Sequence, residues 1–211
     1  MMKTILLDLD GTLIDTTGII IDTFKVTFEK YLSHIEMSDK DYTNLLGQTL
    51  WQTFGYYESD ENKVNDMVEF YRKTSNDMIE SGLNAYPGAI DALKYLRKKG
   101  ATIGVVTSKM RKVALYHLEL TGLKDYIDGL IGYEDVLNHK PDPEPILKAL
   151  ELFNANKETT VYVGDHENDM VAAKKAGIFT CAVTYSQRLE EMLKEQPHFV
   201  IDELAHLKDF I

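Results

Sequence analysis

The chain has 211 residues, a formal net charge of −11, 44% hydrophobic and 27% charged residues, which suits one globular core domain with an insertion or two small domains. The negative charge argues against nucleic acid and anionic membranes as partners. No apolar run approaches the roughly 20 residues that a membrane-spanning helix needs, and the first strand begins too early to leave room for a secretory leader. We therefore expect a cytoplasmic protein. Its single cysteine, Cys181, excludes an intrachain disulfide and is expected in the core.

The first candidate strand ends in acidic residues. Residues 4–13 read TILLDLDGTL, so an apolar run leads into Asp8, Leu9, Asp10 and Gly11. Side chains alternate faces along a strand, so Asp8 and Asp10 point the same way while Leu9 points into the core. Gly11 permits a sharp turn and a close approach to a ligand. The alternative is an ordinary Asp-Gly turn after a buried strand.

Residues 16–84 contain only helical periodicity. Apolar residues recur at three- and four-residue spacing, and acidic residues 58–62 form a loop between helical stretches. The expected helices span residues 19–31, 40–50 with an end near Gly47, and 63–81. This block is therefore predicted to be an inserted all-helical subdomain.

From residue 85 onward, strands and helices alternate. Expected strands span residues 102–107, 129–133, 160–164, 180–184 and 199–201. Expected helices span residues 89–99, 111–120, 143–153, 168–176 and 203–210. Strands separated by such helices predict right-handed crossovers and a doubly wound parallel α/β sheet. We expect residues 1–15 and 85–211 to form this core and residues 16–84 to form the insertion.

Three later segments place polar residues at predicted strand ends or in a rigid loop. Thr107 and Ser108 end a strand, where a hydroxyl and a backbone N–H can cradle a phosphate oxygen or simply cap a helix. Lys140 lies among three prolines, either in a site or in a solvated loop. Asp165 follows a buried strand, and Asp169 comes four residues later at a helix start, where helix capping accounts for one of the two.

The order of these segments, DLDGTL, VVTS, HKPDPEP and GDHEND, resembles the four motifs of the haloacid dehalogenase superfamily, and it covers the core from end to end. In having Asp10, the chain resembles the phosphatases and phosphomutases of that superfamily. The helical insertion resembles its type 1 cap. VVTSK and HKPDPEP are similar to the phosphoglycolate phosphatase and pyrophosphatase branch. The likeness to β-phosphoglucomutase is looser, because the cap-hinge histidine of mutases would fall near Ile20.

This resemblance implies a mechanism at the end of the first strand. Asp8 would be the nucleophile that forms an aspartyl-phosphate, and Asp10 would be the general acid and then the general base. Mg²⁺ would be held by the Asp8 carboxylate, the Asp10 carbonyl and Asp165, with the substrate phosphate completing the coordination.

The resemblance also assigns the residues around the phosphoryl group. Lys140 would offset the clustered negative charge and stabilise the transferring group. Thr107 and the Ser108 amide would bind the remaining phosphoryl oxygens. Asp169 would act indirectly, by orienting Lys140 or a metal-bound water.

Two further groups of candidates are less specific. Lys109 and Arg111 would reach an anionic substrate tail, or else belong to a helix surface, whereas His139 and His166 are expected to be loop residues. In the helical insertion, Gly47 and Gln48 are candidate substrate-binding residues. The neighbouring Trp51 and Phe54 are either part of that substrate-facing segment or core residues of the helices.

The sequence thus predicts a Mg²⁺-dependent phosphatase of a small phosphorylated metabolite, either a phosphoglycolate-like monoester or pyrophosphate. The expected enzyme is a monomer or homodimer with no nucleic-acid or membrane partner. A sugar phosphomutase is the alternative enzyme. A non-catalytic phosphate-sensing or partner-binding protein is the alternative of another class, although a pure binder needs no general acid such as Asp10.

Overall fold

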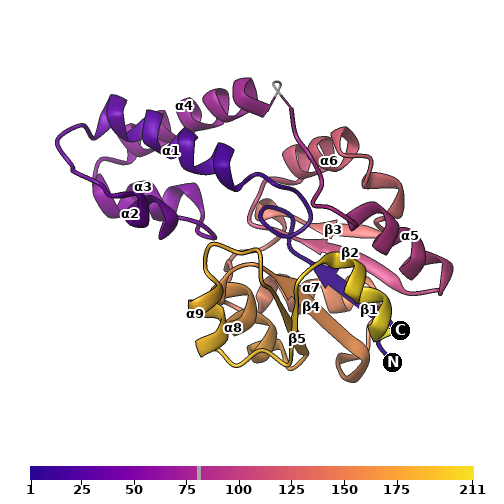
Figure 1. Ribbon diagram of the computed structural model, residues 1–211. Coiled ribbons are helices and arrows are strands. Elements are labelled where there is room, and N and C mark those ends of the chain that lie inside the picture. Colours follow the sequence, from indigo (N-terminus) through magenta and orange to yellow (C-terminus); the bar gives the residue numbers. More distant parts are fainter. Residues whose placement is uncertain (80–81) are drawn as a thin grey trace. The chain divides into compact units, whose positions relative to one another are not determined.

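The computed structural model describes residues 1–79 and 82–211, which divide into two compact units (Figure 1). One unit comprises Met1–Asp15 and Asn84–Ile211, and the other comprises Thr16–Leu83. The chain therefore leaves the first unit just after its first strand and returns to it before the remaining strands. Within the described ranges, no helix is both long enough and apolar enough to cross a membrane.

The first unit is built on a six-stranded sheet with the order β3-β2-β1-β4-β5-β6, in which every neighbouring pair is parallel. The strands are β1 (Thr4–Leu7), β2 (Thr102–Val106), β3 (Gly129–Ile131), β4 (Thr160–Gly164), β5 (Phe179–Val183) and β6 (Phe199–Ile201). This arrangement confirms the predicted doubly wound parallel fold. The strand order reverses at β1, which lies between β2 and β4 (Figure 1), and such a switch point is where α/β sheets bind ligands.

Helices cover both faces of this sheet. The α-helices are α5 (Ala89–Lys98), α6 (Arg111–Leu120), α7 (Glu144–Leu152), α8 (Glu167–Ala176) and α9 (Leu189–Lys194). The 3₁₀ helices are η1 (Lys124–Tyr126), η2 (Tyr133–Asp135), η3 (Lys157–Thr159) and η4 (Leu204–Phe210). Helices α7 and α8 share one buried core with Leu6, Val106 and Tyr162 of three adjacent strands. Right-handed crossovers place α5 on the opposite face, where it packs against β2 and η4.

In the second unit, the described residues form helices joined by turns and loops, with no strand among them. It contains α1 (Thr17–Tyr31), α2 (Asp39–Thr43), α3 (Leu50–Tyr57) and α4 (Glu61–Ile79). Its core is aromatic: the rings of Phe24 and Phe54 meet edge to face at 5.8 Å, and Phe24 lies 4.8 Å from Tyr71 between ring centroids. These contacts join α1, α3 and α4, so each helix buries its apolar side against the others.

Several element boundaries differ from those expected. Helix α2 ends at Thr43, residues 44–47 form turns, and a separate helix α3 follows, which is not among the expected helices. Helix α3 has a capping box, in which Thr49 accepts from the Gln52 backbone and Gln52 accepts from the Thr49 backbone. Helix α9 was also missed, and the C-terminal helix is of the 3₁₀ type. The expected end of the long helix at Ser81 lies outside the described residues.

Replacing Gly104 of β2 with alanine should destabilise the first unit. An added Cβ would lie 2.4 Å from Cε2 of Phe153 and 2.8 Å from Cδ2 of Leu6, so a packed core must shift, at a cost of about 1–3 kcal/mol. Urea unfolding measures this loss. Gly55→Ala is the control, because Gly55 has open space in helix α3 and alanine favours helix there. Equal stability of Gly104→Ala and the wild type would contradict this packing.

Candidate active site

Two carboxylates follow directly from β1. The Asp8 N–H donates to the Val163 carbonyl at 2.9 Å, which extends the pairing of β1 and β4 by one residue. Leu9 is fully buried, whereas the side chains of Asp8 and Asp10 retain 13% and 18% exposure. The alternation expected from the sequence is therefore present, and both carboxylates lie at the carboxyl edge of the sheet.

The turn after these residues packs closely against the end of β4. Gly11 has a φ of 76°, and a Cβ on it would lie 2.1 Å from Oδ2 of Asp165. The Thr12 hydroxyl donates to Oδ1 of the same carboxylate at 2.9 Å. Glycine is therefore required at position 11 both by the backbone conformation and by the approach of Asp165.

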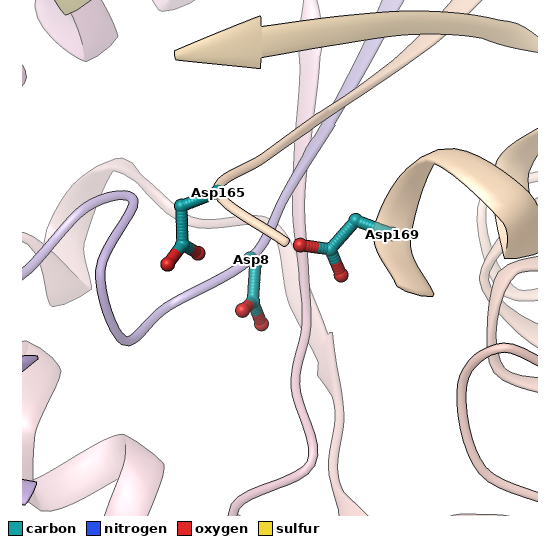
Figure 2. Close-up of side chains that lie close together, drawn as sticks. All are labelled: Asp8, Asp165 and Asp169. Carbon is teal, nitrogen blue, oxygen red and sulfur yellow. The ribbon is translucent and has the colours of Figure 1, made fainter. Parts of the chain in front are cut away.

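Three carboxylates converge at this edge (Figure 2). One oxygen each of Asp8, Asp165 and Asp169 lies within 4.8 Å of the others, a spacing that suits a shared metal ion. Burial raises the pKa of Asp8 to about 7, and burial with the neighbouring Asp8 and Asp169 charges raises the pKa of Asp165 well above its usual value. Full ionisation of the cluster is therefore unfavourable in the absence of a cation, and its carboxylate oxygens are the ligands that Mg²⁺ prefers.

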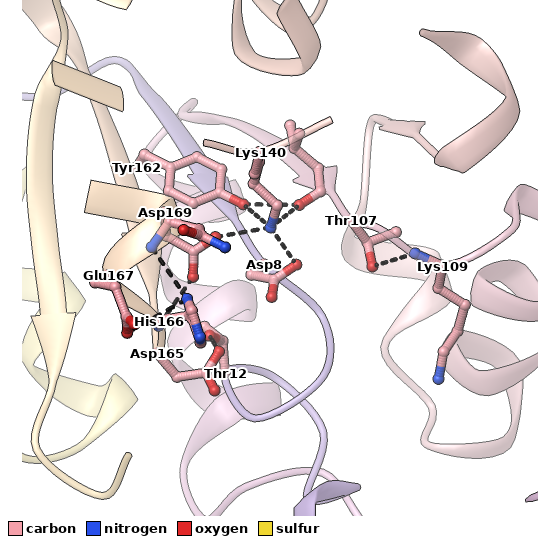
Figure 3. A network of polar contacts seen from close by, with 12 residues as sticks. Asp8, Thr12, Thr107, Lys109, Lys140, Tyr162, Asp165, His166, Glu167 and Asp169 are labelled. Atoms are coloured by element: carbon pink, nitrogen blue, oxygen red, sulfur yellow. Dashed lines mark hydrogen bonds and ion pairs between the residues drawn. The ribbon is translucent and has the colours of Figure 1, made fainter. Parts of the chain in front are cut away.

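The ammonium of Lys140 lies beside this cluster, and the residue is only 5% exposed. Its Nζ is 2.7 Å from Oδ1 of Asp169 and 3.1 Å from Oδ1 of Asp8, and it donates to the Tyr162 hydroxyl at 3.1 Å (Figure 3). Burial alone would lower the pKa of Lys140, but the Asp169 and Asp8 charges raise it well above 10.5. Lys140 is therefore a buried cation in a site and not a solvated loop residue.

Asp169 is held by contacts on both carboxylate oxygens. Oδ1 accepts from Lys140, and Oδ2 accepts from the His166 backbone at 3.1 Å. His166 lies in the bend between β4 and α8, as expected for a loop residue; it is buried and caps α8 by accepting the Asn168 N–H on Nδ1 at 3.0 Å. Because its oxygens are already engaged, Asp169 is better suited to orienting Lys140 than to binding a metal directly.

The segment after β2 contributes Thr107, Ser108 and Lys109. Thr107 is buried, and its hydroxyl accepts the Lys109 N–H at 3.1 Å, while Ser108 follows at the carboxyl edge of β2. The Lys109 ammonium is 2.7 Å from Oδ1 of Asp10, so it does not lie on a helix surface. Arg111 instead donates to the Leu130 carbonyl at 2.7 Å and pairs with Asp135, which ties it to β3 and η2.

The remaining candidates have local contacts. The Gln48 amide donates to the Asn44 carbonyl at 3.4 Å, next to Gly47 with a φ of 73°. Phe54 is fully buried in the aromatic core, and the Trp51 indole donates to Asn65 at 3.1 Å. The alternative that Phe54 is a core residue is therefore the correct one. In the first unit, the His139 ring stacks on Tyr133 with centroids 4.2 Å apart.

Comparison with known proteins identifies the family of the chain. A family model described as haloacid dehalogenase-like hydrolase matches residues 5–183. The chain belongs to this family. It is 35% identical over 211 residues to the pyrophosphatase PpaX of Halalkalibacterium halodurans, with 100% of this chain and 97% of that protein covered. It is also 35% identical over 207 residues to PpaX of Bacillus cereus, with 98% and 94% covered.

A solved structure supports the same family. A Bacteroides fragilis protein described as a haloacid dehalogenase-like hydrolase superposes with a TM-score of 0.89 at 28% identity, covering 98% of this chain and 100% of that one. The predicted family, the fold and the class of enzyme, a hydrolase of the phosphatase type, are thereby confirmed.

Three contacts of this family member were not predicted from its sequence. They are the Tyr162 hydroxyl at Lys140, the Thr12 hydroxyl at Asp165, and the buried His117 ring, whose Nδ1 lies 3.2 Å from Nζ of Lys109. A tyrosine inside an otherwise aliphatic strand was a usable signal, because a buried tyrosine hydroxyl needs a partner. His117 had no such signal, since it occupies a core position of an amphipathic helix.

Removing the Tyr162 hydroxyl should loosen Lys140. That hydroxyl donates to the Val106 carbonyl at 2.7 Å and accepts from Lys140, so Tyr162→Phe deprives two buried groups of a partner. We expect a loss of about 1–3 kcal/mol in unfolding free energy and reduced hydrolase activity. Tyr95→Phe on the surface of α5 is the matched control and should change neither. Wild-type stability and activity in Tyr162→Phe would show that the hydroxyl does not support Lys140.

Proposed function

We propose that the chain is a Mg²⁺-dependent phosphohydrolase that cleaves pyrophosphate or a phosphoglycolate-like monoester through an aspartyl-phosphate on Asp8. The observation that carries this proposal is the convergence of Asp8, Lys140 and Asp165 at the carboxyl edge of the sheet. The similarity to two proteins named pyrophosphatase PpaX favours pyrophosphate among small phosphates. A cytoplasmic location remains a prediction from the sequence.

The proposed reaction has two steps at phosphorus. First, an Asp8 carboxylate oxygen bonds to phosphorus as the bond to the leaving oxygen breaks, and Asp10 gives its proton to that oxygen. Water then attacks the same phosphorus, Asp10 takes the water proton, and the Asp8–phosphorus bond breaks to release phosphate. Supporting the nucleophilic role, Asp8 lies against the buried Lys140, whose charge favours the carboxylate form of Asp8.

Lys140, Thr107 and Ser108 are proposed to hold the transferring group. A Lys140 ammonium already oriented by Asp169 and Tyr162 can stabilise equatorial charge without reorganising in the transition state. Thr107 and the Ser108 amide follow β2, which neighbours β1, so they are available for the remaining phosphoryl oxygens.

The donor set fits a magnesium ion. Three carboxylates, those of Asp8, Asp165 and Asp169, lie close together beside the Lys140 ammonium, and their mutual repulsion would be relieved by a bound cation. Asp8, Asp165 and the Asp10 carbonyl would hold the ion, while Asp169 stays with Lys140. When bound, Mg²⁺ would supply a positive charge that offsets the phosphate oxygens and aligns them for in-line attack.

The helical unit is proposed to act as a cap that selects substrate. Its insertion between Asp15 and Asn84, immediately after the strand that carries Asp8, supports this role. Contact of Gly47 and Gln48 with substrate remains a prediction. The phosphomutase alternative lacks support, because Ile20 occupies the position where a mutase would need an acid–base group, and it packs against the aromatic core.

Asp8→Asn should remain folded and lose activity. The amide is nearly isosteric but cannot form the acyl-phosphate, so we expect kcat to fall by about 10⁴-fold or more. Steady-state phosphate release with pyrophosphate and phosphoglycolate measures this. Asp125→Asn, an exposed aspartate in η1, is the control and should keep wild-type rates. Substantial turnover by purified Asp8→Asn would refute the covalent mechanism.

Activity should disappear after chelation and return with Mg²⁺. Ca²⁺ should bind but support little turnover, because its looser coordination misplaces the nucleophile. In Asp165→Asn, loss of one anionic ligand should raise the Mg²⁺ dissociation constant by at least about tenfold. Calorimetric titration reports this binding independently of turnover. Full activity in chelator, or unchanged Mg²⁺ affinity in the variant, would remove the metal assignment.

A further inference from the structure

The Lys109 side chain connects the first strand to a buried histidine. Its Nζ lies 2.7 Å from Oδ1 of Asp10 and 3.2 Å from Nδ1 of His117. Its backbone is fixed at both ends of the residue: the N–H donates to the Thr107 hydroxyl and the carbonyl accepts from Tyr133 at 2.9 Å. The ammonium is therefore held in one place, and Figure 3 shows this side chain running away from the group around Lys140.

His117 is neutral and serves as an acceptor for this ammonium. The residue is fully buried on α6, and burial, with a smaller contribution from the Lys109 charge, lowers its pKa to about 4. Because an ammonium can only donate, Nδ1 accepts and the ring proton is on Nε2. Among residues 1–79 and 82–211, that buried Nε2 has no hydrogen-bond partner. Leaving such a group buried without a partner is unfavourable, and an aliphatic residue in the same helix position would avoid this penalty.

The two lysines near the end of β1 thus have different partners. Lys140 is engaged by Asp8, Asp169 and Tyr162, on the side of the proposed nucleophile. Lys109 is engaged by Asp10, the group proposed to protonate the leaving oxygen, and must therefore lie near the leaving group. On a chain with a net charge of −11, a positive charge fixed at that position matters most for a leaving group that is itself an anion.

We propose that Lys109, positioned by His117, is an anion subsite for the leaving group, so that the enzyme prefers substrates whose leaving group carries its own negative charge. This inference rests on the proposed function and narrows its substrate class. Pyrophosphate and phosphoglycolate share this chemistry, since their leaving groups are a phosphate and a carboxylate-bearing alcohol. As the phosphorus–oxygen bond breaks, its electron pair goes to the leaving oxygen, Asp10 supplies the proton, and Lys109 offsets the remaining charge.

The test compares substrates that differ mainly in leaving-group charge. Phosphoglycolate and 2-hydroxyethyl phosphate have leaving groups of similar size, one anionic and one neutral, and pyrophosphate supplies the phosphoanhydride arm. In Lys109→Met, loss of a charge-assisted contact should lower kcat/KM about 10- to 100-fold for phosphoglycolate or pyrophosphate, whichever the wild type cleaves. The loss on 2-hydroxyethyl phosphate should be no more than a few-fold. Lys112→Met, at an exposed lysine in the first turn of α6, is the control.

The outcomes separate this inference from the proposed function. Equal losses on anionic and neutral leaving groups would show that Lys109 only orients Asp10, and would overturn the inference. No loss on any substrate would overturn it as well. A wild-type enzyme that cleaves none of these phosphates, with Mg²⁺ present, would instead refute the proposed function itself.

His117 is a positioning residue in this scheme, and a double-mutant cycle tests it. His117→Leu should selectively lower kcat/KM for the anionic leaving groups in the wild-type background, with almost no further loss in Lys109→Met. His117→Gln, which keeps an acceptor, should recover part of the selectivity and replaces the leucine variant if that one does not fold. Additive losses across the cycle would show that His117 acts on the fold and not through Lys109.

Discussion

The structure of this hydrolase depends on one buried ammonium among carboxylates. Removing a charge from water costs several kcal/mol even after relaxation. The burial of the Lys140 charge is offset because Asp8, Asp169 and Tyr162 all lie within hydrogen-bonding distance of its Nζ. The same contacts hold the Asp8 carboxylate beside it. Removing any one partner of Lys140 would leave an uncompensated buried charge. These contacts therefore hold together four parts of the fold: the ends of β1 and β4, the start of α8 and the loop that carries Lys140.

The sheet topology explains why residues so far apart in the sequence meet. Strand β1 lies where the strand order reverses, and β2 and β4 pair with it on either side. The residues that follow these three strands, Asp8, Thr107 and Asp165, therefore come together at one edge. The glycine after Asp10 then allows Asp165 to approach the first loop more closely than any side chain would permit.

The ends of the strands were the most predictable part of this molecule. The period of the apolar residues, the length of each apolar run and the glycines that follow it are all set by neighbouring residues in the sequence. Asp8, Thr107 and Asp165 follow β1, β2 and β4 as expected. The proline-rich loop left the role of Lys140 open, and only the order of the four motifs assigned Lys140 to the site. Helix α3 was missed because it is short and its capping box was overlooked. The partners of Tyr162 and His117 could not be predicted, because only the packing of distant elements supplies them. For Tyr162 the sequence signals only that a buried hydroxyl needs some partner, and for His117 it signals nothing.

The central claim is that Asp8 carries the phosphoryl group during turnover. The most direct measurement is to mix wild-type enzyme with Mg²⁺ and pyrophosphate or phosphoglycolate, quench it within one turnover, reduce with borohydride and analyse the peptide that contains residues 4–13 by mass spectrometry. An acyl-phosphate is reduced to an alcohol, so the account predicts homoserine at position 8 and unmodified aspartate at position 10. Reduction at position 10 alone, or turnover with no reduced residue at any quench time, would contradict it.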